Sequence, residues 1–390
     1  MRWEELDLTD PGTFLLGAPH ELFARLRRED PVFLHRRPDR PHFWVVTGYA
    51  DVVRISRDWS SFSAGRNGAF LDEQPDDGAR TMASLDPPEH GELRALIDGA
   101  FTAEAVARRA GRVRALCGQV LDRVSGRGEC DFVRDVAAEF AIAVLADLAG
   151  FPDEEDRHRV LRLTGVLDDP EEPPGSAARA TMGIFELAHE LADWRRRAPA
   201  DDLISVLAGG PLSRRAYELL FLLLATAGQL STRHLLSGAM LALAVHPEQW
   251  RLLVADPGVL GTGVEEMMRW VTPAMRFQRT ATRDTTIGGR RVTAGERVVL
   301  YLISANRDES VFDRPERFDL TRTPNPHVAF GGGGPHVCLG EHLARLSARV
   351  LFEELARRMP DLELAGAPEY LCSTFANGIR SMPVRFTPGG

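Results

Sequence analysis

The sequence predicts a mainly α-helical fold with small β-sheets (α+β). Residues 213–245 carry apolar side chains on nearly all sides of a helix on the order of 30 residues long, or ~45 Å, as in a helix that runs through a protein core. Leucine and valine also recur at helical spacing after Cys338, so a second helix begins at or just after this cysteine. The strand patterns, in contrast, are short.

The whole chain points to one globular unit. Its 390 residues, with 44% hydrophobic residues, show no repeat or linker, so we expect a single domain over 1–390, β-rich near residues 30–60 and helical in the remainder. A net charge of −9 argues against nucleic acid as a partner. The chain contains arginine but no lysine, which fits a high-GC genome. The four cysteines form no paired motif, which fits a reducing compartment. The polar start and the short apolar runs predict a cytoplasmic protein with no membrane partner.

Strand signals gather in the N-terminal part. Residues 31–35 and 42–47 read as two strands joined by a proline-rich turn, and a short helix follows at 50–57. Residues 62–83 lack periodicity and contain several Gly and Asp, so we expect a loop. Two prolines at 87–88 then open a helix.

The remainder is expected to be mostly helical. Residues 103–201 show one break, at 168–175, where an acidic, proline-rich segment can neither pack nor propagate a helix. This segment is either a mobile entrance loop or a plain surface connection. Ser213 is a credible N-cap of the long helix, which ends at His246-Pro247. A further helix is expected within 257–270, and a hairpin around 287–292.

Residues 329–345 combine a glycine run, one cysteine and the start of a helix. The glycines can bend into turns closed to other residues, and backbone N–H groups at a helix N-terminus favour a thiolate. Such a thiolate suits a metal ligand. A phosphate loop would need Gly-Lys-Ser/Thr at its end, which is absent, and a dinucleotide loop would follow a strand near the start of a βαβ unit. A plain structural turn remains the other interpretation of this stretch taken alone.

The stretch resembles the haem-binding loop of the cytochrome P-450 family, whose cysteine thiolate is the axial ligand of haem iron. His336 and Gly340 stand around Cys338 as in the family pattern, but Phe330 lies eight residues before the cysteine rather than seven, so the loop is one glycine longer. The resemblance implies haem b as the cofactor and Cys338 as its metal ligand. It also implies the family fold, with the haem between the long central helix and the helix after the cysteine loop.

Further motifs follow the family order. His90 and Arg94, four residues apart on one helix face, and Arg279 match residues that hold the haem propionates in the family. On their own, His90 and Arg94 would be a solvated surface pair. Glu266, Arg269 and Arg317 match a buried cluster that, in the family, pins the cysteine loop to the core.

The middle of the long helix departs from the family, which usually has Ala/Gly-Gly-x-Asp/Glu-Thr there. The small Gly228 leaves room for O2, Ser231 stands in place of the water-orienting threonine, and Leu230 replaces the acid although it carries no proton. A register one residue later would place Thr232 at the alcohol position but would misplace Gly228. The missing acid has three interpretations. In the first, protons arrive through Gln229, ordered water or a polar group of the substrate, and ordinary oxygenation is kept. In the second, the enzyme couples or dehydrogenates its substrate or uses peroxide, and in the third, Leu230 is a neutral change that leaves activity weak.

The resemblance implies a soluble haem-thiolate oxidoreductase, a monooxygenase that activates O2 to oxidise a largely apolar small molecule, as in actinobacterial secondary metabolism. The sequence carries no flavin or iron–sulfur motif, so the electron donors are expected to be a separate ferredoxin and ferredoxin reductase. The alternative from another class is a non-catalytic haem protein that binds or senses a ligand.

The expected substrate pocket rests on alignment to the family. Met275, Thr374 and Phe375 are expected to line it, together with Leu230 and parts of residues 62–83. Arg276 is unusual beside such a pocket. It either anchors a carboxylate, points to solvent, or packs on the haem edge.

Overall fold

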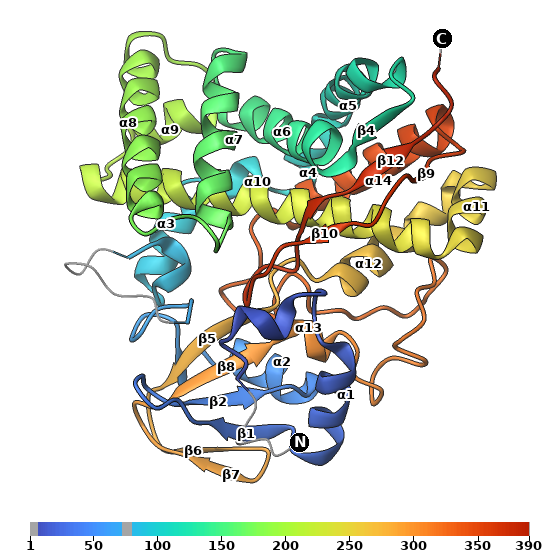
Figure 1. Ribbon diagram of the computed structural model, residues 1–390. Helices are drawn as coiled ribbons and strands as arrows, with labels where there is room; N and C mark the ends of the chain where they lie inside the picture. Colours follow the sequence, from blue (N-terminus) through green and yellow to red (C-terminus); the bar gives the residue numbers. More distant parts are fainter. Residues whose placement is uncertain (1–6, 72–79, 390) are drawn as a thin grey trace.

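The computed structural model describes residues 7–71 and 80–389. The expectations for the first six residues and for 72–79 of the predicted loop therefore lie outside the described residues. Figure 1 shows a helical part and a β-rich part side by side, with helix α10 (Arg214–Val245) running across the helical part. This arrangement confirms the predicted fold class.

Helix α10 is the element around which the helical part is built. Ser213 caps it as predicted, because its Oγ accepts a hydrogen bond from the Ala216 N–H at 3.2 Å. The helix packs against α6 (Glu139–Ala149), α8 (Ser176–Arg197) and α12 (Leu260–Val271). By length and composition it could also cross a membrane, but its place between other helices accounts for its apolar surface.

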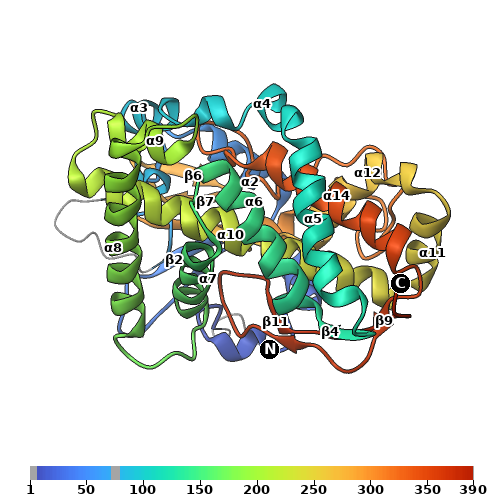
Figure 2. The same cartoon turned by 90° about the horizontal axis from the view of Figure 1, so that it is seen from above.

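The other helices cover α10 on several sides, as Figure 2 shows from above. They are α3 (Glu89–Ala95), α4 (Ala103–Arg108), α5 (Ala110–Ser125), α7 (Glu154–Asp168), α9 (Leu203–Gly209), α11 (Pro247–Ala255) and α14 (Glu341–Arg358). One large apolar cluster joins α5, α10, α12 and α14, and a second joins α6, α8, α9 and α10. The two clusters meet along α10.

The expectation of a single break within residues 103–201 is wrong. Strand β4 (Glu129–Asp131) interrupts the helices and pairs with β12 (Pro383–Arg385), which also pairs with β9 (Glu363–Leu364). The backbone of β4 finds its hydrogen-bond partners in the C-terminal strand, a contact that local periodicity does not reveal. The break at 168–175 is present, between the ends of α7 and α8.

A mixed five-stranded sheet forms the β-rich part. Its order is β1 (Val32–His35), β2 (Phe43–Val46), β8 (Arg297–Tyr301), β5 (Arg276–Ala281) and β3 (Phe62–Ser63). Only the β2–β8 pair is parallel. The β-rich part is therefore not confined to residues 30–60, because half of the sheet comes from residues 276–301. Strand β3 also places a short strand at the start of the predicted loop.

Smaller elements complete the β-rich part. Helices α1 (His20–Glu29), α2 (Tyr49–Arg57) and α13 (Leu302–Ala305) pack beside the sheet. The predicted hairpin is present as β6 (Thr285–Ile287) and β7 (Arg290–Val292), with the two glycines between them at positive φ. The last pair is β10 (Glu369–Tyr370) with β11 (Ile379–Ser381), and the turn between them runs past the start of β5.

Candidate functional site

The glycine run folds tightly against helix α2. Gly331, Gly333 and Gly334 adopt φ values of +99°, +98° and +77°, which L-residues with side chains rarely adopt. A Cβ atom at Gly334 would lie 2.5 Å from the Ser56 carbonyl oxygen, and one at Gly332 would lie 2.7 Å from the Ser56 Oγ. The loop therefore needs glycine for two reasons, its backbone conformation and its contact with α2.

This loop presents the Cys338 thiol. The Cys338 N–H donates to the Phe330 carbonyl oxygen at 2.9 Å, and the Gly340 N–H donates to the Cys338 sulfur. Helix α14 begins three residues after the cysteine, at Glu341. The surrounding protein desolvates the thiol and so raises its pKa, although the side chain also borders open space, while the Gly340 N–H and the charges of Arg94 and Arg345 act in the opposite direction. A bound metal cation would deprotonate such a thiol, which would then be a ligand with a ready N–H donor.

The middle of α10 lies across from the cysteine segment. Leu339 and Leu343 pack into the same apolar cluster as Leu223 and Leu224 of α10. Ala227, Gly228 and Ser231 are exposed although they occur in the middle of a helix with buried neighbours on both sides. Exposed positions in the middle of a core helix border open space, and the Cys338 side chain is exposed as well. The thiol and Ser231 therefore lie on accessible surfaces of two elements that pack together.

Cationic and imidazole side chains gather beside the loop. His90, on α3, has its ring centroid 4.4 Å from that of His336. Arg94 donates from Nη1 to the Val337 and Pro335 carbonyl oxygens at 2.5 and 3.3 Å, and its Nε contacts Asp98 at 3.3 Å. Burial lowers the pKa of Arg279 to about 10, so this guanidinium stays charged at neutral pH.

Two of these four residues, Arg279 and His336, have no anion paired with them within the described residues. Arg279 is 6% exposed and donates only to the Gln278 carbonyl oxygen, and within the described residues it forms no ion pair. His336 Nε2 is buried without a partner, and burial together with the nearby Arg279 lowers the His336 pKa to about 3. Buried donors and charge of this kind call for an acidic ligand group. They fit the two propionates of a haem, and the thiol fits its iron.

A haem held through cysteine needs a thiolate ligand and groups that bind its carboxylates at the edge, and the residues gathered here fit both needs of a haem-thiolate protein. The family model described as "Cytochrome P450" matches residues 259–359. Over 98% of its length the chain is 36% identical to a steroid C26-monooxygenase of Rhodococcus jostii, of which 85% is covered. It is 37% identical to the putative cytochrome P450 126 of Mycobacterium tuberculosis, with 98% of both chains covered.

A solved structure agrees with these relatives. Cytochrome P450 CYP268A2 of Mycobacterium marinum, in complex with pseudoionone, superimposes with a TM-score of 0.92 at 38% identity, and 99% of both chains is covered. The chain belongs to the cytochrome P450 family. It is a monooxygenase of that family, and its cofactor is haem b.

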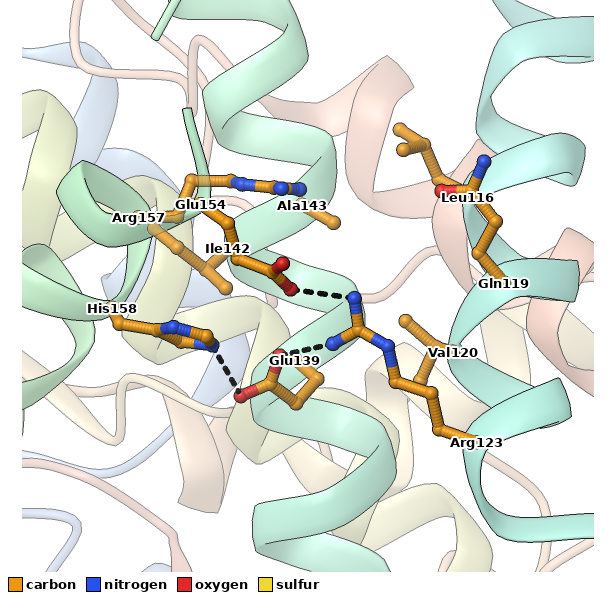
Figure 3. Close-up of a pocket in the computed structure, with 10 residues that line it drawn as sticks. All are labelled: Leu116, Gln119, Val120, Arg123, Glu139, Ile142, Ala143, Glu154, Arg157 and His158. Atoms are coloured by element: carbon orange, nitrogen blue, oxygen red, sulfur yellow. Dashed lines mark hydrogen bonds and ion pairs between the residues drawn. The ribbon is translucent and has the colours of Figure 1, made fainter. Parts of the chain in front are cut away.

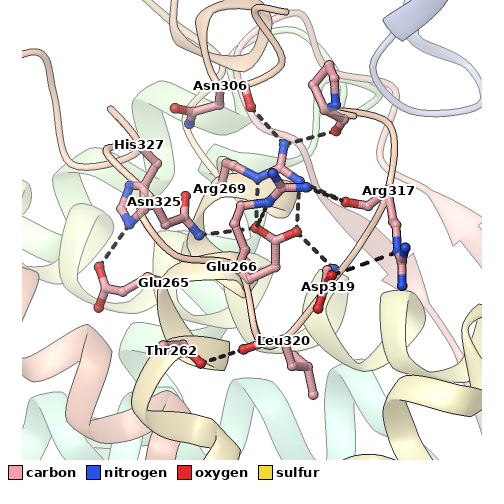
Figure 4. Close-up of polar contacts among 12 residues, drawn as sticks. Thr262, Glu265, Glu266, Arg269, Asn306, Arg317, Asp319, Leu320, Asn325 and His327 are labelled. Atoms are coloured by element: carbon pink, nitrogen blue, oxygen red, sulfur yellow. Dashed lines mark hydrogen bonds and ion pairs between the residues drawn. The ribbon is translucent and has the colours of Figure 1, made fainter. Parts of the chain in front are cut away.

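A buried ion cluster holds the segment that leads into the cysteine loop (Figure 4). Glu266 and Arg269 form a bidentate pair, and Arg269 also donates to the carbonyl oxygens of Asn306, Pro315 and Arg317. The second arginine of the cluster is Arg322, whose Nε lies 3.0 Å from Glu266 Oε2. The expected Arg317 contributes its carbonyl oxygen instead. Its side chain is half exposed and lies 3.8 Å from Asp319, because the chain turns its backbone inward at this position.

A second network, which the sequence reasoning missed, lies behind Phe330. The Arg345 guanidinium lies over the Phe330 ring at 4.4 Å, and Glu265 accepts from both Arg345 and His327. Arg345 is held on its other side by Glu341 at 2.7 Å. The i,i+4 spacing of Glu341 and Arg345 was a usable signal, but Glu265 comes from another helix.

The remaining α10 residues face different neighbours. Gln229 is fully buried, and its Oε1 accepts from Thr164 of α7 at 3.3 Å, so its side chain lies on the α7 side of the helix. Ser231 Oγ donates to the Ala227 carbonyl oxygen at 2.6 Å, and Thr232 Oγ1 donates to that of Gly228 at 3.1 Å. Leu230 is half-buried. The site residues of α10 are therefore spread around the helix.

Ion pairs hold the segment between α7 and α8 against α10 and β11. Asp168, the last residue of α7, pairs with Arg233 and, at 3.1 Å, with His234, both on α10. Asp169 and Glu171 lie 3.0 and 2.7 Å from Arg380 of β11. Of the two interpretations left open by the sequence, the contacts favour a connection that is held closed over α10.

The expected substrate residues lie at one end of β5. The rings of Phe70, Phe277 and Phe375 form a cluster with centroid distances of 5.3–6.0 Å. Thr374 accepts hydrogen bonds from Arg276. Met275 is 1% exposed and packs among Phe14, Phe23 and Tyr301, within the cluster on one face of the sheet.

A separate hollow lies between α5, α6 and α7 (Figure 3). Arg123 of α5 contacts Glu139 at 3.5 Å and Glu154 at 2.5 Å, and His158 lies 3.5 Å from Glu139. Its cavity volume of about 10 Å³ holds one water molecule at most. This hollow is an ion-pair junction between three helices and has no room for a substrate.

Proposed function

We propose that this monooxygenase oxidises a mid-sized, largely apolar metabolite with O2 and with electrons from a separate ferredoxin and ferredoxin reductase. The observation that carries the proposal is the Cys338 thiol, with its Gly340 N–H donor, on an element that packs against the exposed middle of α10. Bound haem supplies O2 binding and activation there, with thiolate as the electron-donating ligand. The chain itself must hold the substrate, exclude bulk water and deliver protons.

Ser231 is the proposed alcohol of the site. Its hydroxyl donates to the Ala227 carbonyl oxygen, which leaves the lone pairs of Oγ free to accept a proton or to orient a water molecule. Gly228 has no side chain to fill the space beside Ser231. A Cβ atom at this position would lie 3.0 Å from Leu145 Cδ1, so a larger residue would displace that leucine. We assign no role in proton delivery to Gln229, because its buried side chain lies on the α7 side of the helix, where Oε1 accepts from Thr164 and Nε2 has no partner among the described residues.

The proposed route for protons is therefore water held by Ser231, or a polar group of the substrate itself. Leu230 excludes a carboxylate at the usual position, and a leucine side chain accepts no hydrogen bond. This arrangement makes proton supply dependent on what is bound. Substrates that place a hydroxyl or carbonyl near Ser231 are expected to be oxidised with less waste of reducing equivalents than hydrocarbons of the same shape.

The apolar character of the substrate is supported by the half-buried rings of Phe70, Phe277 and Phe375. Two kinds of relatives are consistent with it, since several are named steroid C26-monooxygenase and one solved structure holds pseudoionone. For the electron donor, exposed Arg57 on α2 contacts the cysteine loop, and exposed Arg349 lies on α14, the helix that follows the loop; both supply positive charge for an acidic ferredoxin.

A second candidate function is an oxidation other than hydroxylation, such as coupling, dehydrogenation or a peroxide-driven reaction. The specific observation in its favour is that the middle of α10 offers no acid at position 230 while Gln229 faces α7. A non-catalytic ligand-binding role rests on the same departure.

The test begins with the reduced, CO-bound visible spectrum of the purified protein, which must show the thiolate-type Soret shift. NAD(P)H consumption is then measured with surrogate ferredoxin and reductase on a library of steroids and terpenoids, and products are identified by mass spectrometry. An added oxygen atom in a product supports the proposal. Coupled or desaturated products, or turnover with peroxide only, favour the second candidate. A thiolate spectrum without turnover of any library member favours ligand binding.

A further inference from the structure

Arg276 lies at the start of β5, where the sequence left three alternatives open. It is 6% exposed, so it does not point to solvent. Successive side chains of a strand face opposite sides of the sheet, so Arg276 and Gln278 share one face while Phe277 and Arg279 share the other. Arg276 therefore does not lie on the haem edge with Arg279. The alternative that remains is an anchor for an anion.

The guanidinium is held in place but only partly satisfied. Its Nε donates to the Thr374 carbonyl oxygen and its Nη2 to the Thr374 Oγ1, both at 2.7 Å. Nη1 is buried without a partner, and within residues 7–71 and 80–389 Arg276 forms no ion pair. A buried guanidinium without an anion is destabilising, so this donor calls for a ligand.

A second unpaired donor lies on the same face of the sheet. Tyr301 is the register partner of Arg276 on the neighbouring strand β8, and its hydroxyl is fully buried without a partner. Burial raises the pKa of Tyr301 to about 12, and the charge of Arg276 acts on this hydroxyl in the opposite direction. The hydroxyl therefore keeps its proton at neutral pH. A fixed guanidinium N–H and a phenol O–H suit the two oxygens of a carboxylate.

Apolar rings lie at the same end of β5 as this pair of donors, on the other face of the strand. Phe277, the next residue along β5, has its ring 5.7 Å from that of Phe375, and Phe375 follows Thr374 directly. Phe70 completes the cluster from the segment before residue 72. All three rings are half-buried, so they present apolar surface at the end of the strand that Arg276 begins.

We propose that Arg276 binds the carboxylate of the substrate, which makes the substrate class apolar carboxylic acids whose hydrocarbon body passes the end of β5 and lies on Phe70, Phe277 and Phe375 on the other face. This inference rests on the proposed function, since it names the substrate class of the same site. Because Arg276 and Arg279 face opposite sides of the sheet, the carboxylate is held away from the haem edge. Oxidation is then directed to the part of the molecule remote from the carboxylate.

The test compares matched ligands on the haem-loaded protein. Dissociation constants are measured by calorimetry at neutral pH for 5β-cholanic acid and its methyl ester, and for dodecanoic acid and methyl dodecanoate. In each pair the hydrocarbon body is the same and only the charge differs. The expected result is that at least one acid binds about ten-fold or more tightly than its ester, which corresponds to ~1.4 kcal/mol.

Three variants identify the residue responsible. R276M should remove the preference for the acid, and R276K should keep part of it, because an ammonium retains the charge but not the fork of donors. R380M is the matched control: Arg380 lies on the same C-terminal segment but is paired with Asp169 and Glu171, so the preference should persist. Thermal unfolding and the CO-bound spectrum establish that each variant is folded and loaded.

Two results would overturn the inference. One is equal affinity for acid and ester in both pairs, including no measurable binding of either. The other is a preference that survives in R276M. Both leave the proposed function intact as long as the thiolate-type CO spectrum is present, whereas the absence of that spectrum counts against the proposed function itself.

Discussion

Arg269 lies side-on against Glu266, with Nε 2.7 Å from Oε2 and Nη2 2.8 Å from Oε1, and both side chains are completely shielded from solvent. Arg322 approaches the same carboxylate, and the Asp319 N–H donates to it. One carboxylate therefore balances two guanidinium groups and anchors the backbone that leads into the cysteine loop.

Glu266→Gln should destabilise the protein strongly, because it leaves two buried cations without an anion. The expected loss is ~3–5 kcal/mol in the free energy of unfolding, measured by urea denaturation of the haem-loaded protein. Glu363→Gln is the control, since its pair with Arg385 is largely exposed and should contribute less than about 1 kcal/mol. A loss for E266Q as small as that of the control would contradict the anchoring role.

Stability at low pH should depend on Glu265. Burial alone would raise its pKa, but the hydrogen bonds from His327 and Arg345 outweigh burial and lower it to about 2. The unfolded value is ~4.3, so the stabilisation is complete above that pH and is lost as the pH falls toward the folded-state pKa. The difference in unfolding free energy between wild type and E265Q should be constant above pH ~5 and should shrink below it. If the difference in unfolding free energy between wild type and E265Q grows on acidification, the pKa of Glu265 is not lowered by folding as predicted.

Substitutions on α10 should separate the routes of proton delivery. Ser231→Ala should lower the fraction of NAD(P)H that ends in product and raise peroxide release, because the proposed water-orienting hydroxyl is lost. Leu230→Glu should raise coupling by a large factor if oxygenation is limited by protons. If L230E is neither faster nor better coupled, a reaction other than hydroxylation is favoured. Thr232→Ser keeps a hydroxyl one position on and is the control, with little change expected.

The connection after α7 should open more readily when Asp168 is neutralised. Its carboxylate is 8% exposed and pairs with Arg233 and His234, whereas Asp169 is 29% exposed and pairs with the partly exposed Arg380. Asp168→Asn should therefore speed ligand entry several-fold in stopped-flow experiments, and Asp169→Asn much less. Equal rates of ligand entry in both variants would show that the Asp168 ion pairs do not limit entry.

Glycine-to-alanine changes should have opposite effects in two places. Gly334→Ala adds a Cβ that would lie 2.5 Å from the Ser56 carbonyl oxygen at a positive φ, so unfolding free energy should fall by ~1–3 kcal/mol, with loss of bound haem. Gly118, inside α5, has open space around its Cβ position, so G118A should stabilise by ~0.5–1 kcal/mol. Denaturation curves and haem content measure both.

Much of the fold could be predicted because its signals are local. The N-cap Ser213, the stop at His246 and the glycine turn between β6 and β7 each act within a few residues, and the structure has all three. Strand β4 could not be predicted, because the three residues after Gly128 form a strand only through pairing with β12, which comes from the other end of the chain. The parallel pairing of β2 with β8 has the same origin.

The site could be predicted where a residue type in its sequence context has few possible roles. A cysteine after four glycines is such a case. Arg322 was not, because its choice over Arg317 depends on which way the backbone turns after Pro315. The sequence could not tell whether Arg276 points to solvent, because its burial depends on the strands that pair with β5.

The contact between Gly334 and Ser56 also restricts which substitutions evolution can accept at these positions. A side chain gained at position 334 meets the main chain of α2, so no substitution of Ser56 alone can make room for it. Lineages that lengthen or shorten the glycine run should carry compensating shifts in the helix opposite. The loop and α2 are thus inherited as one unit, although 274 or more residues separate them in the chain.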